Sequence, residues 1–238
     1  MIKRKNFHHK GLVYSFNWNM ENHKKLKEIS NNPDIIKLWN FFERIGKGDI
    51  PNQLFNDYNL PRISQFKLSG INPKILGSFK TKLIRQGKIK RLDEISKYSK
   101  MVQSVFRNFK QNGLKEKPNH EAVLKNILIK DEESLAIEIP VWKRSQNGSL
   151  TGHIDLIQAN ENLIKVIDYK PEGRFLWSLP QVATYGNLIK NLLKIKKLRC
   201  ISFSLREVWE YNPEILLSDI KDLLINHGYG DRKWEKYF

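Results

Sequence analysis

Hydrophobic residues in the first half of the chain recur at the spacing of helices. Residues 21–46 predict two helices separated by Asn31-Asn32-Pro33, since a proline after such polar residues opens a new helix. The apolar positions of the second helix approximate helical spacing, namely Ile35, Ile36, Leu38, Trp39, Phe42 and Ile45. Residues 94–117 predict a further basic helix that ends near Gly113. The first half is therefore expected to be mostly helical.

Residues 60–92 predict two helices and a short extended piece. Gly70 interrupts the first helix, Asn72-Pro73 opens the second, and Gly87 closes it before the extended residues 88–92. This order resembles a helix-turn-helix with a wing. Its basic side chains would contact DNA, namely Lys74, Lys80, Lys82, Arg85, Lys88, Lys90 and Arg91. A helical hairpin with a solvated basic face is the open alternative, and either arrangement can supply phosphate contacts.

A different pattern begins after residue 117. Short apolar runs that suit β-strands alternate there with helical segments. The expected strands are 135–142, 152–159, 163–168 and 199–209, and the expected helices are 119–129, 180–193 and 214–226. A polar hairpin loop at 143–149 would join the first two strands. This order predicts an α/β domain at 118–238 on a small mixed sheet, preceded by a basic helical domain at 1–117.

The net charge of +17 is concentrated in the first half of the chain. Residues 1–117 contain 25 lysines and arginines against 9 acidic residues, whereas residues 118–238 contain 17 against 16. This asymmetry favours a region that binds a polyanion, followed by a nearly neutral region with other chemistry. An evenly solvated basic surface is the plainer alternative.

Composition narrows the class of protein further. The single cysteine, Cys200, excludes an intrachain disulfide and a multi-cysteine zinc or iron–sulfur site. No apolar stretch approaches the length of a bilayer span, and no helix combines a basic face with a bulky apolar one. We therefore expect a cytoplasmic protein without a membrane partner. His8, His9 and His23 show no ligand spacing and are expected at the surface.

Three charged residues interrupt strands that otherwise have a buried character. Strand 163–168 is apolar on both faces, and Asp168 and Lys170 share one face by two-residue alternation. A hairpin would place Asp155 of the preceding strand opposite Val166, as a diagonal neighbour of Asp168. Two carboxylates held together repel each other, and a divalent ion such as Mg²⁺ or Mn²⁺ relieves that repulsion. A salt bridge at the exposed end of a hairpin is the alternative.

Three motifs together resemble a known nuclease family. The segments "GHID" at 152–155 and "VIDYK" at 166–170 resemble the core of the PD-(D/E)XK nuclease superfamily. The segment "QVATY" at 181–185 resembles the Gln-x-x-x-Tyr motif of its RecB-like exonuclease branch. The resemblance covers about residues 118–193 and implies a restriction-endonuclease-like mixed β-sheet core flanked by helices. Ile154 stands where the proline of the family's name would be.

The resemblance also implies roles for these side chains. Asp155 and Asp168 would bind the metal, and Lys170 would serve the nucleophilic water. The helix before the sheet contributes a His or Glu ligand in this branch, and the chain offers His120 and Glu121. Adjacent helical residues point about 100° apart, so one of the two is expected to face the ion. Either His120 or Glu121 therefore stays open as the ligand.

Three further residues are expected near the same site. Gln181 and Tyr185 lie at i and i+4 on one helical face and would touch the lysine or the substrate strand, although ordinary packing also explains Tyr185. Glu138 would support the metal ligands from the strand 135–142.

The expected activity is metal-dependent hydrolysis of a DNA phosphodiester with Mg²⁺ or Mn²⁺. A RecB-like exonuclease in DNA repair, recombination or processing is the first interpretation. A site- or structure-specific endonuclease and a non-catalytic DNA-binding module of the same fold are the alternatives. The expected partner is double- or single-stranded DNA, and a protein partner or a homo-oligomer stays open.

Overall fold

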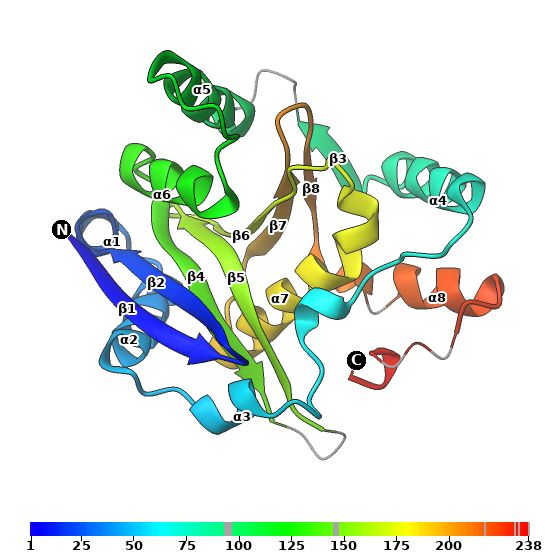
Figure 1. Cartoon of the computed structure of the whole chain (residues 1–238). Coiled ribbons are helices and arrows are strands. Elements are labelled where there is room, and N and C mark those ends of the chain that lie inside the picture. Colours follow the sequence, from blue (N-terminus) through cyan, green and yellow to red (C-terminus); the bar gives the residue numbers. More distant parts are fainter. Residues whose placement is uncertain (93–96, 145–147, 217, 231, 233, 238) are drawn as a thin grey trace.

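The computed structural model describes residues 1–92, 97–144, 148–216, 218–230, 232 and 234–237. Its centre is one eight-stranded mixed sheet in the order β1-β2-β4-β5-β6-β7-β8-β3 (Figure 1). The strands are β1 (Ile2–His9), β2 (Leu12–Asn19), β3 (Ile89–Leu92), β4 (Ser134–Lys143), β5 (Leu150–Ala159), β6 (Ile164–Tyr169), β7 (Leu198–Phe203) and β8 (Val208–Tyr211). Strand β6 pairs with β7 in parallel, and the other neighbours pair antiparallel. The predicted α/β class is confirmed.

Eight α-helices lie in the described part of the chain. They are α1 (Met20–Ile29), α2 (Pro33–Lys47), α3 (Asn52–Asn56), α4 (Pro73–Arg85), α5 (Lys97–Gln111), α6 (His120–Lys130), α7 (Phe175–Leu193) and α8 (Asp219–Asn226). Helices α5 and α6 share one hydrophobic core with the sheet, and α2, α4, α7 and α8 share the other. In Figure 1, α5 and α6 lie together at the upper left, and α4 and α8 lie at the right. None of these helices is both long and apolar enough to cross a membrane.

The expectation of a mostly helical first half is wrong for its first nineteen residues, which form the hairpin β1–β2. Strand β2 pairs with β4, and β3 pairs with β8, so strands from both sides of the expected boundary at 117/118 share one sheet. Such pairing joins residues that are far apart in sequence, and local periodicity cannot reveal it. The division into a DNA-holding region and a nuclease region stays a prediction about function.

The expected helix-turn-helix lacks its first helix. Only the 3₁₀ turn Ile63–Gln65 forms there, and the following segment is irregular up to α4. Phe66 and Leu68 are fully buried, and the Leu68 amide donates to the Trp177 carbonyl of α7. These tertiary contacts fix the backbone instead of helical hydrogen bonds. The expected wing is β3, an edge strand of the main sheet.

Helix α7 begins at Phe175, five residues before the expected start at Pro180. Proline has no N–H and is therefore most often found in a first turn. Here the buried side chains of Phe175 and Leu179 hold an additional N-terminal segment against the core. A helix therefore forms where the sequence predicts one, but it begins earlier than expected.

Three other expectations change in extent. The single strand expected at 199–209 is the hairpin β7–β8, and the helix expected at 214–226 is the 3₁₀ turn Pro213–Leu216 followed by α8. The expected loop at 143–149 and the start of the helix expected at 94 lie partly outside the described residues.

His9 and His23 are fully buried, contrary to the expected surface positions. The His23 ring lies between α1 and α2, where Nδ1 accepts a hydrogen bond from Trp18 Nε1 at 3.1 Å and Nε2 donates to the Ile35 carbonyl at 3.0 Å. Both bonds require a neutral imidazole. Burial lowers the pKa of His23 from 6.5 to about 4.

Because the folded pKa of His23 lies below the unfolded value, its contribution to stability is present above pH 6.5 and is lost as the pH falls towards 4. We expect protonation of His23 alone to lower the free energy of unfolding by about 2.5 kcal/mol between pH 7 and pH 4.5. Urea unfolding of wild type and His23→Gln at both pH values measures it, since glutamine keeps both bonds without titrating. The stability difference between the two proteins should shrink by that amount on acidification, and a constant difference would refute the assignment.

Candidate metal centre

The regular alternation of side chains breaks at one position in each of two adjacent strands, so residues two apart there point to opposite faces of the sheet. In β4 and β5, Ile137 pairs with Leu156 and Ile139 pairs with Ile154, so Glu138 lies across from Asp155. Alternation would put Ile137 and Ile139 on the same face, yet Ile137 packs in the α6 core and Ile139 in the α7 core. The change of face occurs at Glu138, whose φ of 53° is left-handed. Such a backbone costs about 1–3 kcal/mol and is typical of functional sites.

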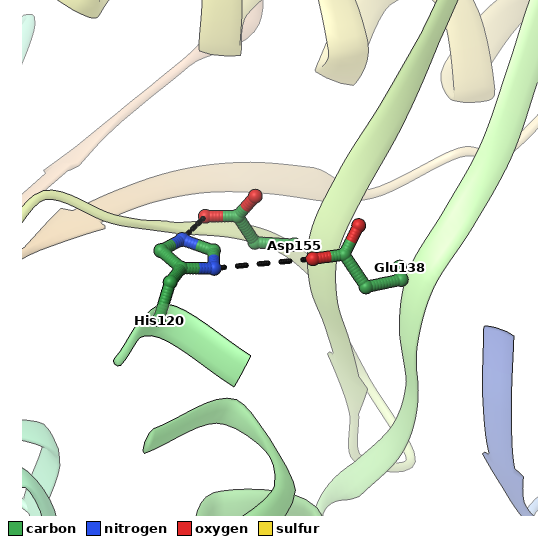
Figure 2. Close-up of side chains that lie close together, drawn as sticks. All are labelled: His120, Glu138 and Asp155. Carbon is green, nitrogen blue, oxygen red and sulfur yellow. Dashed lines mark hydrogen bonds and ion pairs between the residues drawn. The ribbon is translucent and has the colours of Figure 1, made fainter. Parts of the chain in front are cut away.

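Helix α6 delivers an imidazole to these two carboxylates. The Asn119 side chain accepts from the Ala122 amide and starts the helix, so His120 occupies the first turn. His120 Nε2 lies 2.9 Å from Asp155 Oδ2, and Nδ1 lies 3.9 Å from Glu138 Oε1. Figure 2 shows the imidazole beside the two carboxylates, with one ring nitrogen directed at each of them. The ligand atoms of the three residues all lie within 4.8 Å of one another.

The electrostatics of this triad follow from its partial burial. Burial lowers the pKa of His120, but the Asp155 and Glu138 carboxylates outweigh it and raise the value to about 9. Burial, together with the Asp155 charge, raises the pKa of Glu138 to about 8. Burial alone would raise the pKa of Asp155 as well, but the charge of His120 outweighs this effect and holds that pKa below its usual range. In the protein without an ion, the positive imidazole therefore compensates the crowded acids.

Asp168 and Lys170 form a second pair at the end of β6. Lys170 Nζ lies 2.8 Å from Asp168 Oδ2, as the shared strand face predicted. Gln181 of α7 joins them, since its Nε2 lies 3.5 Å from Asp168 Oδ1 and its Oε1 lies 3.5 Å from Lys170 Nζ. Burial raises the pKa of Asp168 to about 7, although the Lys170 charge acts in the opposite direction. The expected contact between Gln181 and the lysine is thus present.

Tyr185 lies one helical turn beyond Gln181 and is almost fully buried. Its ring packs on the backbone of Gly152, where an added Cβ would lie 2.6 Å from ring atom Cε1. Any larger residue at position 152 would therefore displace the ring. Burial, together with the charges of Asp155 and Asp168, raises the Tyr185 pKa.

The register between β5 and β6 differs from the expected one. Val166 lies opposite Ile157, and Ile167 lies opposite Leu156, so continuation of the ladder puts Asp155 across from Asp168 and not diagonal to it. The paired part of the ladder ends before these aspartates, and the Tyr169 amide donates to Asp155 Oδ2 at 2.9 Å. A loop two residues longer than the expected turn accounts for the shift.

The ligand group found among the described residues therefore comprises His120, Glu138 and Asp155. Glu121, the alternative helix residue, forms an ion pair with Lys125 at 2.7 Å on the outer side of α6. Glu138 was expected only to support the ligands. The available signal was a glutamate in an apolar strand beside the Gly-x-x-Asp strand, but its left-handed backbone is not readable from sequence. Direct metal binding by Asp168 stays a prediction.

One basic residue of α4 is linked through two aromatic rings to the start of α7. Lys80 Nζ lies 5.6 Å from the centre of the Trp209 ring, which stacks on Phe175 at 4.4 Å. Phe175 begins α7, five residues after Lys170. Lys74, Lys82, Arg85, Lys90 and Arg91 are exposed. Lys88 is also exposed, but it forms an ion pair with Asp219 at 2.5 Å, so its charge is partly compensated.

Comparisons with known proteins add little to this description. No protein-family model matches the chain, and no curated protein matches it significantly. Among solved structures, the crystal structure of SSO0001 has 14% sequence identity to this chain and a TM-score of 0.28, over 71% of this chain and 93% of that chain. A likeness with this TM-score carries no conclusion about fold or function.

Proposed function

We propose that this chain is a metal-dependent deoxyribonuclease of the PD-(D/E)XK type with a restriction-endonuclease-like core. One observation carries the proposal. His120, Glu138 and Asp155 converge from three separate elements on one partly buried point, and the Asp168–Lys170 pair lies beside it. A lone salt bridge, the plainer interpretation, needs neither the additional carboxylates nor the strained Glu138 backbone.

The donor set fits a divalent ion of the Mg²⁺ or Mn²⁺ class. It offers two carboxylates and one imidazole nitrogen close together, in a place where burial makes uncompensated acids unfavourable. These three residues would hold the ion, which when bound polarises a phosphate and lowers the pKa of a bound water. The imidazole gives up its proton for this purpose, because only the neutral ring is a ligand.

The remaining residues of the site act on the substrate. Lys170 carries a full positive charge, since the Asp168 carboxylate raises its pKa against the effect of burial. Its ammonium group can donate to the attacking water or to a phosphate oxygen. Asp168 and Gln181 fix the position of that ammonium group through the contacts described above. The side chains of α4 would hold the DNA backbone nearby.

Within the nucleases we favour a RecB-like exonuclease that acts in DNA repair, recombination or processing. The contacts of Gln181 with Asp168 and Lys170 support this choice, because they join the Gln-x-x-x-Tyr helix to the acid–lysine pair. The endonuclease interpretation depended on a helix-turn-helix, and that segment has only one helix.

A cleavage assay on linear and circular DNA, single- and double-stranded, tests the proposal. With Mg²⁺ or Mn²⁺ we expect loss of linear DNA, intact circles, and no reaction in EDTA. Nicking of circles would assign an endonuclease instead. Intact linear and circular substrates with both ions would refute the nuclease proposal.

A further inference from the structure

We propose that a second groove, away from the metal centre, binds a single-stranded stretch of the DNA substrate. The inference rests on the proposed nuclease function. A pocket of about 1050 Å³ lies between residues 58–66 and the side chains of Arg232, Trp234, Glu235 and Tyr237, next to the turn of the β1–β2 hairpin. Basic and aromatic side chains predominate in its lining, with Lys10, Tyr58, Arg62, Arg232 and Trp234 among them, and one carboxylate, Glu235, also lines it.

The positive charges of this groove are bound to neutral acceptors within the described part of the chain. Lys10 Nζ donates to the Leu60 carbonyl, Arg62 donates to the Tyr14 hydroxyl, and Arg232 donates to two backbone carbonyls. None of the three cations forms an ion pair with a described carboxylate. Arg232 Nε is buried and has no hydrogen-bond partner among the described residues.

Two of these cations lie close enough to repel each other. Burial and then the Arg62 charge lower the pKa of Lys10, although the Asp57 carboxylate acts in the opposite direction. Lys10 also has a left-handed φ of 50°, in the turn between β1 and β2, and its amide donates to Asn56 Oδ1 at 2.8 Å. The backbone thus holds a lysine near an arginine at some cost in energy, and an anion such as a phosphate would relieve it.

The aromatic residues make the groove suitable for unpaired bases. Tyr58 is 78% exposed, and Lys10 Nζ lies 5.8 Å from the centre of its ring. Phe66 and Trp234 stack on each other at 5.6 Å but are buried, so Tyr58 is the ring of this set that is exposed for stacking. Exposed rings beside cations bind single strands, because unpaired bases stack on the rings while the cations follow the phosphates. Paired bases are not available for such stacking.

The groove is connected to the metal centre through β5. The first residues of β5 are not paired with β6. There Arg62 forms a parallel β-bridge with Thr151. Thr151 precedes Asp155 by four residues, a distance of about 13 Å along a strand. A strand of DNA that occupies the groove can therefore reach the carboxylates within a few nucleotides.

The test measures binding of a fluorescent oligothymidine in EDTA, so that no cleavage is required. The full-length protein carries Asp168→Asn and is compared with the same protein that also carries Lys10→Asn and Tyr58→Ala. Asparagine tolerates the left-handed backbone of Lys10, and Tyr58 is exposed, so we expect both to fold normally by circular dichroism. We expect about tenfold weaker binding, and a salt dependence reduced by about 0.7 in log–log slope.

Lys24→Asn is the matched control, because Lys24 is 69% exposed on α1 and its loss removes the same charge. It should change single-strand binding by less than twofold, and the groove variants should weaken duplex binding less than single-strand binding. Unchanged oligothymidine binding in the groove variants, or an equal loss for duplex DNA, would overturn the inference. The nuclease proposal is judged separately, by metal-dependent cleavage with wild type.

Discussion

Cleavage of linear DNA is expected to fall about a thousandfold when Asp155 is replaced by asparagine. The amide would keep the size of the side chain but lose the charge that faces His120 at 2.9 Å. In the proposed mechanism the Asp155 carboxylate would bind the ion, so the substitution would replace a charged ligand by a neutral amide, whose oxygen can still accept from the Tyr169 amide. Losses of this size are typical when a group that stabilises transition-state charge is removed.

Glu121→Gln provides the matched control for that experiment. Glu121 adjoins His120 in sequence, but its carboxylate is bound to Lys125 and lies outside the ligand group. We expect activity within about twofold of wild type, whereas His120→Asn should lose activity as Asp155→Asn does. Initial rates at saturating Mn²⁺ measure all three variants. Full activity in Asp155→Asn, or a large loss in Glu121→Gln, would place the site elsewhere.

Glu138→Gln is expected to stabilise the protein in EDTA and to remove most of the stabilisation that Mn²⁺ gives. In EDTA the variant should be more stable than wild type by about 1–3 kcal/mol, because one of two facing, partly buried acids is removed. In wild type, Mn²⁺ at about one hundred times its Kd should add about 2.7 kcal/mol, and the variant should lose most of this gain. Thermal unfolding with and without Mn²⁺ measures both effects and requires no DNA.

Glu133→Gln serves as the control for the ion effect. Glu133 precedes β4 and forms ion pairs with Lys97 and Lys165, at 2.8 and 2.9 Å, away from the metal centre. This variant should be destabilised equally in EDTA and in Mn²⁺, with the Mn²⁺ gain intact. A full Mn²⁺ gain in Glu138→Gln would exclude Glu138 as a ligand.

Much of the site was predictable because its signals are local. Two-residue alternation put Asp168 and Lys170 on one strand face, and the structure pairs them at 2.8 Å. Helical spacing put Gln181 and Tyr185 on one side of α7, where Gln181 contacts Asp168 and the Tyr185 ring packs on Gly152. Each prediction needed only the period of one element, which neighbouring parts of the fold do not alter.

The position of Glu138 could not be predicted in the same way. Its contact with His120 depends on the register between β4 and β5 and on a left-handed backbone at Glu138, where β4 changes the face that it presents. Alternation assumes a regular strand and therefore fails at such a residue. The expected register between β5 and β6 was also wrong, because the length of the connecting turn determines that register.

By itself, the sequence determined the elements whose causes lie within a few residues. Asn32 and Asn72 cap α2 and α4 through bonds to the amides two residues ahead, and three of the four strands expected in the second half form as β4, β5 and β6. Such bonds and spacings act between neighbours, so they survive in any fold.

Only the tertiary structure decided how distant segments combine. It placed the β1–β2 hairpin and β3 in the central sheet and replaced an expected helix by the 3₁₀ turn Ile63–Gln65. It also brought His120, Glu138 and Asp155 to one point, and Lys10 near Arg62. Strand pairing and core packing determine these arrangements, because both join residues that no local pattern connects.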